Sequence, residues 1–225
     1  MTPTFPNRRL FVAAGLAYLV IILCGLGAEL VLRGPLVTPG DATATAAAIQ
    51  ANLGPFRGAI AADLVMALAD TAVALLLFAA FRAVAPLLAL AAMVLRLMQG
   101  VLIASGLMFL QGAALLLTTH QGPDAASQAL WLIDMHAHGY DLGLVFFGVN
   151  SLLMSVLLWR AGFVPRVLSV GLFAAGGVYL VGSSLRFFGP ELAPYFAPAY
   201  GLTVLSEAAF ALWLLSGGRW TRRVA

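Results

Sequence analysis

The chain has 225 residues, of which 62% are hydrophobic and only 9% are charged, and its mean hydropathy is +1.00. A soluble globular fold cannot bury that much apolar surface, so the composition predicts an integral membrane protein. The 12 basic residues, all arginines, exceed the 9 acidic ones by only three charges, and they form no clustered basic face of the kind that nucleic-acid binding requires.

Long apolar segments follow one another along the chain, and each can span a hydrocarbon core of about 30 Å as a helix. They predict one all-α membrane domain over residues 1–225, a polytopic transmembrane bundle with about six spans at residues 10–32, 56–82, 84–118, 136–159, 164–187 and 197–217. The first span follows Arg8 and Arg9 and contains the single cysteine, Cys24. A signal peptide is the alternative interpretation, but the length of this segment favours a retained helix.

The third predicted span is too long for one perpendicular crossing. We expect its distal end to project past the membrane or to tilt, with a possible break near Gly112. Two longer connections, 33–55 and 119–135, are each expected to hold a short helix on the outer surface. Asp41 is a good N-cap for a helix over residues 42–52, and Pro123 could open a second one over residues 123–133.

Arginines next to the span ends are distributed unevenly between the two faces of the predicted bundle. Eight of them share one face if both termini are cytoplasmic: Arg8, Arg9, Arg82, Arg160, Arg166, Arg219, Arg222 and Arg223. Only Arg33, Arg57 and Arg186 then lie near the opposite face. Because basic residues concentrate on the cytoplasmic side of membrane proteins, this asymmetry predicts that both termini are cytoplasmic.

Ionisable groups inside the predicted spans are candidate functional residues, because each needs an internal partner or a water-filled cavity. Asp63 and Asp70 share one face of the second span, while Arg96 and Gln99 lie one turn apart on the third. Arg96 is about 15 Å from the cytoplasmic start of its helix, and Asp70 should lie at a similar depth on the antiparallel neighbour. We therefore predict an Asp70–Arg96 ion pair, which could fix helix register or belong to a functional site.

The densest polar sequence, residues 134–141, lies at the outer end of the fourth predicted span. Its histidines and carboxylates could bind a divalent metal such as zinc, with His136, His138 and Asp141 as candidate ligands. Histidines two positions apart on a regular helix point about 200° away from each other, so no metal cofactor is favoured. We expect His136 and Tyr140 instead to hydrogen-bond headgroups or loops at the membrane interface.

The remaining ionisable residues lie on the first, fifth and last predicted spans. Glu207 is about ten residues inside its span and must find an internal partner, whereas Glu29 and Arg186 are near the outer interface and can snorkel. The residues that could line an outward-opening polar pocket are then Asp63, Asp70, Arg96, Gln99, His136, Tyr140, Asp141, Arg186 and Glu207. The sequence contains no nucleophile elbow, phosphate loop or zinc-protease motif, so we assign no enzyme class.

Several short stretches between residues 10 and 185 carry a family resemblance: Pro39-Gly40-Asp41 with Thr43 and Thr45, Ile49 to Asn52, Phe56-Arg57, Asp63-Leu64, Asp70, Leu95-Arg96-Leu97, His136 with Gly139-Tyr140, Gly143 to Gly148 and Pro165-Arg166-Val167-Leu168. Together they resemble the bacterial membrane-protein family called domain of unknown function 4386. In that family pattern the histidine corresponds to His136, whereas His138 falls where other residues are common. The resemblance implies the topology and a bacterial inner membrane, and it implies no mechanism.

We favour a non-enzymatic function, in which the bundle binds, senses or passes a small amphipathic or lipid-like molecule through an outward-facing polar pocket. One alternative is an intramembrane metal-dependent hydrolase with His136, His138, Asp141 and Asp63 as ligands. Others are a structural or accessory subunit of a membrane complex and proton-coupled transport through Asp70 and Glu207. The expected partners are membrane lipids, a small amphipathic ligand and a second copy or membrane protein, without nucleic acid.

Overall fold

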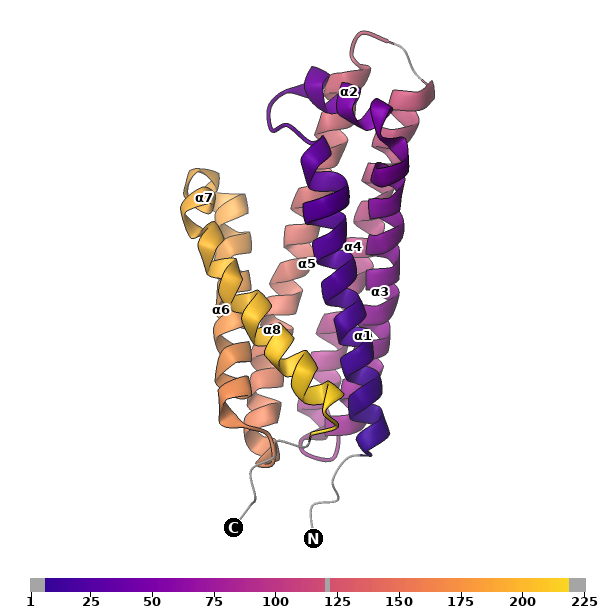
Figure 1. Ribbon diagram of the computed structural model, residues 1–225. Coiled ribbons are helices and arrows are strands. Elements are labelled where there is room, and N and C mark those ends of the chain that lie inside the picture. The colour runs from indigo at the N-terminus through magenta and orange to yellow at the C-terminus, as the bar shows by residue number, and fades with distance from the viewer. Residues whose placement is uncertain (1–6, 120–121, 219–225) are drawn as a thin grey trace.

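The computed structural model describes residues 7–119 and 122–218, and within these ranges it is a bundle of long helices (Figure 1). Six helical stretches are long and apolar enough to cross a membrane, which confirms the predicted number of spans. Their main helices are α1 (Arg8–Leu26), α3 (Leu53–Phe81), α4 (Pro86–Thr119), α5 (Ala125–Ala161), α6 (Arg166–Phe188) and α8 (Tyr200–Leu215). Large apolar side chains face outward along them, as a lipid-facing surface requires, including Leu87, Met108, Val167 and Leu205.

The start of α1 and the end of α8 lie at the same end of the bundle, which we call the inner end (Figure 1). From there, α1, α3, α4 and α5 rise as a tall group, while α6 and α8 form a shorter pair that diverges from it (Figure 1). Helices α4 and α5 have 34 and 37 residues. At 1.5 Å per residue they are about 51 and 55 Å long, so their outer parts extend well beyond a hydrocarbon core of about 30 Å.

The continuity of α4 corrects one expectation, because this helix runs through Gly112 without a break. The long third span is therefore a single continuous helix. Two shorter elements extend α1 at its outer end, a π-helical segment over Gly27–Arg33 and a 3-10 turn over Gly34–Leu36. Before α8, the chain passes through the short turns Pro190–Leu192, Ala193–Phe196 (α7) and Ala197–Ala199.

The first predicted surface helix is present as α2 (Ala42–Ala51), which lies across the outer end of the tall group (Figure 1). Asp41 caps it as expected, since its Oδ1 accepts a hydrogen bond from the backbone N–H of Ala44 at 2.9 Å. Gln50 Nε2 donates to the carbonyl of Leu117 at 2.9 Å and so covers one of the last carbonyls of α4. This contact fastens α2 to the bundle.

The second expected surface helix, over residues 123–133, is not a separate element. Helix α5 begins at Ala125 and continues to Ala161, so the fourth span starts eleven residues before the predicted position 136. Residues 125–138 contain no glycine or proline, and they pack on α4 through Ala129 and Ile133. Nothing local ends the helix, and apolar contacts in the outer part of the bundle hold it in place.

Two apolar cores lie at different heights in the bundle. The inner core contains aromatic side chains from α1, α3, α8 and the α5–α6 connection, among them Phe11, Phe81, Phe163 and Trp213. The outer core joins α2 to the outer parts of α3, α4 and α5, through residues such as Ile49, Phe56, Leu110 and Ile133. The buried ionisable side chains lie between these two cores.

Helices α5 and α6 touch backbone to backbone at two glycines. A Cβ added at Gly176 would lie 2.8 Å from the carbonyl oxygen of Gly148, and one at Gly148 would lie 3.0 Å from that of Gly176. Such a close approach of two helices in a membrane requires residues without side chains. The neighbouring Gly177 faces open space, with no atom near its added Cβ.

The glycine contact predicts different effects of alanine at adjacent positions. Gly176→Ala should lower the stability of the detergent-solubilised protein by about 1–3 kcal/mol, because the two backbones must separate. Gly177→Ala should be neutral or stabilise by about 0.4–1 kcal/mol, because alanine restricts the unfolded chain and meets no neighbour. Thermal unfolding midpoints of both variants measure this difference. Equal midpoints would show that the helices do not depend on the contact.

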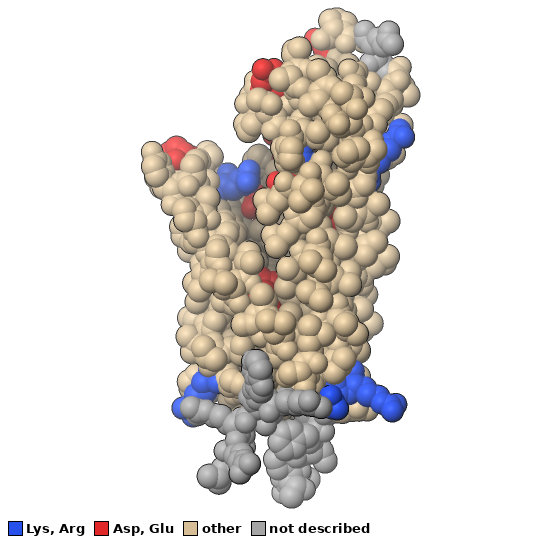
Figure 2. Space-filling view, in the orientation of Figure 1, with Lys and Arg blue, Asp and Glu red and all other residues tan. Residues whose placement is uncertain are grey.

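The orientation of the bundle in the membrane stays a prediction from the arginines. Arg8, Arg9, Arg82, Arg160 and Arg166 are exposed at the ends of their helices, and basic side chains line the inner end in Figure 2. Arg219, Arg222 and Arg223 lie outside the described residues.

Reporter fusions after Thr45, Ala83, Gln128 and Gly162 should report the outside, inside, outside and inside of the cell. If the reporter after Thr45 is found in the cytoplasm, the predicted orientation is wrong.

Candidate functional site

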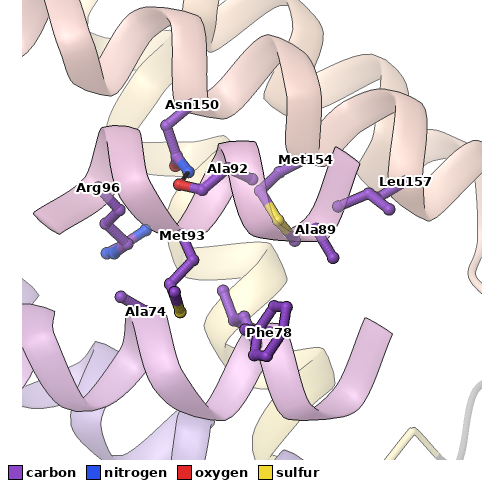
Figure 3. Close-up of a pocket in the computed structure, with 10 residues that line it drawn as sticks. Ala74, Phe78, Ala89, Ala92, Met93, Arg96, Asn150, Met154 and Leu157 are labelled. Atoms are coloured by element: carbon purple, nitrogen blue, oxygen red, sulfur yellow. Dashed lines mark hydrogen bonds between the residues drawn. The ribbon is translucent and has the colours of Figure 1, made fainter. Parts of the chain in front are cut away.

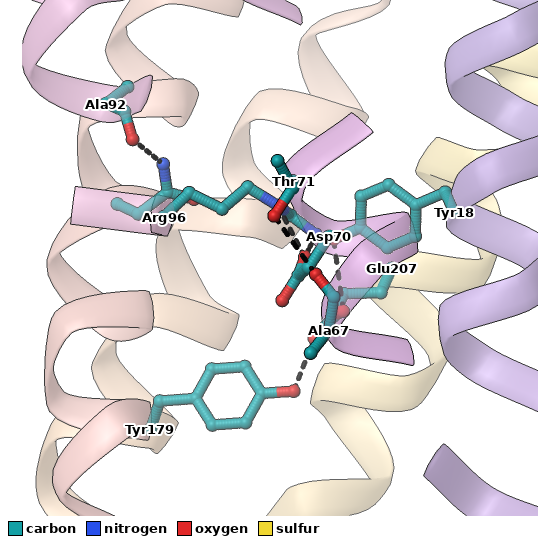
Figure 4. Close-up of polar contacts among 9 residues, drawn as sticks. Tyr18, Ala67, Asp70, Thr71, Ala92, Arg96, Tyr179 and Glu207 are labelled. Carbon is teal, nitrogen blue, oxygen red and sulfur yellow. Dashed lines mark hydrogen bonds and ion pairs between the residues drawn. The ribbon is translucent and has the colours of Figure 1, made fainter. Parts of the chain in front are cut away.

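All six long helices contribute one side chain to a buried group between the two apolar cores. We call this group the central cluster; it consists of Tyr18 on α1, Asp70 on α3, Arg96 on α4, Phe147 on α5, Tyr179 on α6 and Glu207 on α8 (Figure 4 shows five of them). Counted from the inner ends of α3 and α4, Asp70 and Arg96 lie about 15 Å deep, half the thickness of a hydrocarbon core. The cluster therefore joins the whole bundle near mid-membrane.

The predicted ion pair is present at the centre of this cluster. Arg96 Nε donates a hydrogen bond to Asp70 Oδ1 at 2.7 Å, and Arg96 Nη2 lies 2.6 Å from the same oxygen. Both residues are at most 3% exposed. The guanidinium carbon lies 4.8 Å from the ring centroid of Tyr18 and 5.0 Å from that of Phe147, so two aromatic rings cover the cation.

Glu207 finds its internal partners among tyrosines rather than arginines. Tyr18 donates its hydroxyl to Oε2 at 3.1 Å, and Tyr179 donates its hydroxyl to Oε1 (Figure 4). Within the described residues, Glu207 forms no ion pair. One guanidinium and two carboxylates thus meet in the central cluster, where Asp70 alone pairs with the cation.

A second ionic group lies toward the outer end, where Arg33 joins two carboxylates. Its Nη1 lies 2.6 Å from Asp63 Oδ2, and its Nη2 lies 2.6 Å from Glu29 Oε2. The sequence predicted Arg33 near the outer face, but its side chain is only 7% exposed. The π-helical segment sets this position, because it widens the helix between Glu29 and Arg33 and turns the guanidinium toward α3.

His136 does not make the contacts with headgroups or loops that the sequence suggested. It is 3% exposed, and neither of its ring nitrogens has a hydrogen-bond partner. The ring lies against α4 where Gly106 leaves room, since an added Cβ there would come within 3.3 Å of Nδ1. A side chain that was expected to bond headgroups is therefore enclosed by protein, beside the backbone of Gly106.

The two histidines of the 134–141 segment point to different places. His138 is exposed, and its Nδ1 lies 2.8 Å from the carbonyl oxygen of Asp134. Asp141 instead forms an ion pair with Arg186 across α5 and α6. Over residues 7–119 and 122–218, no three histidine, cysteine or acidic side chains come together as metal ligands.

Further polar side chains connect the outer ionic group to the central cluster. Gln99 lies one turn outward of Arg96 on α4, is 5% exposed, and its Oε1 has no partner. Tyr140 is half-buried on α5, one turn from His136, and their ring centroids are 6.2 Å apart. These residues, the outer ionic group and the central cluster together form a series that we call the polar column. Besides the central cluster, it consists of Glu29, Arg33, Asp63, Gln99, His136, Tyr140, Asp141 and Arg186.

Apolar packing closes the polar column toward the inner end. Below Arg96 there is a cavity of about 10 Å³, which is the size for about one water molecule. Its walls are otherwise apolar except for Asn150, which donates to the carbonyl of Ala92 at 2.6 Å (Figure 3). Further in, Phe11 packs at centroid distances of 6.0, 6.3 and 5.3 Å on Phe81, Phe163 and Trp213.

The outer side of the bundle has a surface hollow beside the column. Figure 2 shows the surface hollowed between the α6–α8 pair and α1, with acidic and basic atoms inside the hollow. The half-buried residues Tyr179 and Tyr200 agree with this opening, as does Glu207, which keeps 8% of its surface exposed. The surface is therefore hollowed beside the polar column on the outer side, and aromatic side chains pack at its inner end.

Comparison with known proteins identifies relatives of unknown activity. A family described as Domain of unknown function (DUF4386) matches residues 13–218. An uncharacterized protein of Archaeoglobus fulgidus is 35% identical over 80 residues, which cover 35% of this chain and 46% of that protein. The match thus spans less than half of the relative's length. No solved structure matches the chain.

The Asp70–Arg96 pair predicts non-additive effects of mutation. Asp70→Leu or Arg96→Leu alone should cost about 3–5 kcal/mol, because each leaves an uncompensated buried charge. The double variant should lose much less than the sum, because two apolar side chains replace two charges. Exposed Arg57→Leu controls for the loss of an arginine. Unfolding midpoints in detergent give the coupling, and simple additivity would mean that the two side chains do not stabilise one another.

Proposed function

The chain belongs to the family described as Domain of unknown function (DUF4386), and from the geometry of its cavity we propose a ligand-binding function. In this proposal it is a multi-pass protein of the bacterial inner membrane. Its polar column binds, senses or passes a small amphipathic or lipid-like molecule that enters from the outer side. The observation that carries the proposal is the set of buried polar atoms without partners along the column, Gln99 Oε1 and both nitrogens of His136.

Unpartnered polar atoms are costly inside a membrane protein. Each buried donor or acceptor without a hydrogen bond costs about 1–3 kcal/mol, and no bulk water is present in the bilayer to satisfy it. The same column contains well-formed bonds, such as those of Arg33 to Asp63 and Glu29. A bound polar group that completes the bonds of Gln99 and His136 explains why they are free in the isolated chain.

The position of the opening supports an amphipathic molecule rather than a freely soluble one. Helix α6 has 23 residues and is about 35 Å long, so its outer end reaches only slightly beyond a hydrocarbon core of about 30 Å. The hollow between α1 and the α6–α8 pair therefore opens at the level of the lipid headgroups. A molecule with a polar head and an apolar tail can enter there, and its head can then move inward along the column toward Arg96 and Glu207.

The closed inner end supports an outward-open binding state. Passage of a molecule through the bundle requires separation of the aromatic side chains Phe11, Phe81, Phe163 and Trp213. Binding or sensing needs no such movement. No observation favours the metal-dependent hydrolase, since His136 and His138 face different surroundings.

Thiol labelling tests whether the column opens outward. Because Cys24 is the only cysteine, Cys24→Ala gives a background into which single cysteines can be placed. Tyr140→Cys in the column should react with a membrane-impermeant thiol reagent added outside cells, as should exposed Thr43→Cys on α2. Met154→Cys in the inner core should react from neither side. If Tyr140→Cys reacts only from the cytoplasm, or is as unreactive as Met154→Cys, the proposed opening is wrong.

A further inference from the structure

The polar column holds more carboxylates than guanidinium groups. Its five acidic side chains are Glu29, Asp63, Asp70, Asp141 and Glu207, and its three basic ones are Arg33, Arg96 and Arg186, which leaves two negative charges in excess. The side chain of Glu29 is 61% exposed, so water solvates one of these two excess negative charges. Glu207 is 8% exposed and has no cationic partner within the described part of the chain.

Glu207 is thus a buried carboxylate that accepts two tyrosine hydrogen bonds and, within the described residues, has no ion pair of its own. The hydroxyls of Tyr18 and Tyr179 bond both of its oxygens but bring no positive charge. Asp70 holds the nearest guanidinium, that of Arg96, through an ion pair of 2.6 Å. Since an unbalanced charge in hydrocarbon is costly, an ionised Glu207 favours one more positive charge beside it.

Aromatic side chains lead from the outer loop to this carboxylate. Phe196 packs on Tyr200 at a centroid distance of 6.4 Å, Tyr200 packs on Tyr179 at 6.0 Å, and Tyr179 packs on Phe147 at 5.1 Å. Tyr179 also bonds Glu207 directly (Figure 4). Aromatic faces attract organic cations, and this attraction is strongest where water is excluded.

We propose that the molecule bound in the polar column has a positively charged ammonium head, which Glu207 holds between the aromatic side chains, and an apolar tail. This inference rests on the proposed function and adds the chemical class of its ligand. Gln99, one turn outward of Arg96, offers its unpartnered Oε1 as an acceptor for an ammonium N–H. The ammonium head supplies the missing charge and one missing hydrogen bond at once.

Other charged groups fit the site less well. A phosphate or carboxylate head would meet the excess of negative charge and would have to compete with Asp70 for Arg96. A divalent cation requires six or more oxygen ligands or a set of histidines and thiolates, whereas Glu207 is the one unpaired carboxylate of the central cluster. A proton on Glu207 would balance the charge without any ligand. In that case Glu207→Gln would leave the affinity for an ammonium ligand unchanged.

Binding of three matched probes to the full chain tests the proposal. Octylammonium, octanol and octanoate share one tail and differ in head charge, and calorimetry in phosphatidylcholine nanodiscs, with empty nanodiscs as the reference, measures their saturable binding. We expect octylammonium to bind at least about tenfold more tightly than octanol, and octanoate to bind weakest. Glu207→Gln should reduce the octylammonium affinity about tenfold and leave octanol unchanged. Exposed Glu191→Gln, a matched loss of one carboxylate, should change neither.

The outcomes separate this inference from the proposed function. If octanol or octanoate saturates the protein and octylammonium binds no better, the cavity binds amphipathic molecules but the charge assignment is overturned. Unchanged octylammonium affinity in Glu207→Gln also overturns it, since a proton or another group then balances Glu207. If none of the three probes saturates, the proposed function fails and this inference fails with it. If Glu207→Gln does not fold, the order of the three probe affinities for the unmodified chain decides whether the ligand head is positively charged.

Discussion

A guanidinium near the middle of a membrane imposes the constraint on which the rest of this structure depends. Arg96 cannot remain charged in hydrocarbon without a partner, so α3 must place Asp70 at its depth. The planar guanidinium also makes cation–π contacts with Tyr18 from α1 and Phe147 from α5. Because Tyr18 then bonds Glu207 on α8, one buried charge connects helices from both ends of the sequence.

This polar layer explains why the bundle has two apolar cores instead of one. Helices α3, α4 and α5 contribute to both cores, whereas α1, α6 and α8 contribute to the inner core, and the α6–α8 pair is the shorter one (Figure 1). The inner core can therefore pack all six helices, while the outer core depends on α2 to cover it. The cavity lies at the boundary, where the bundle changes from six helices to four and the α6–α8 pair separates from α1 (Figure 2).

The features that the sequence predicted well are those set by local composition and helix geometry. Apolar length identified the spans, Asp41 identified the start of α2, and equal depth on antiparallel neighbours identified the Asp70–Arg96 pair. The features that were missed depend on tertiary contacts. The hydroxyls that satisfy Glu207 come from helices whose crossing is not encoded in any spacing, and His136 is buried only because Gly106 lets α5 approach α4. The continuous α5 likewise reflects packing outside the membrane.

The π-helical segment Gly27–Arg33 makes the outer ionic group sensitive to chain length. In this segment the backbone N–H of Gly34 bonds the carbonyl of Glu29, five residues back, so one residue more than in an α-helix occupies the turn. Deleting one residue there would restore regular α-helical winding and close the widened turn that positions Arg33. Arg33 would then leave Asp63 although both residues were still present. A single-codon deletion can therefore break this ion pair, whereas most substitutions on the lipid-facing surface of α1 leave it in place.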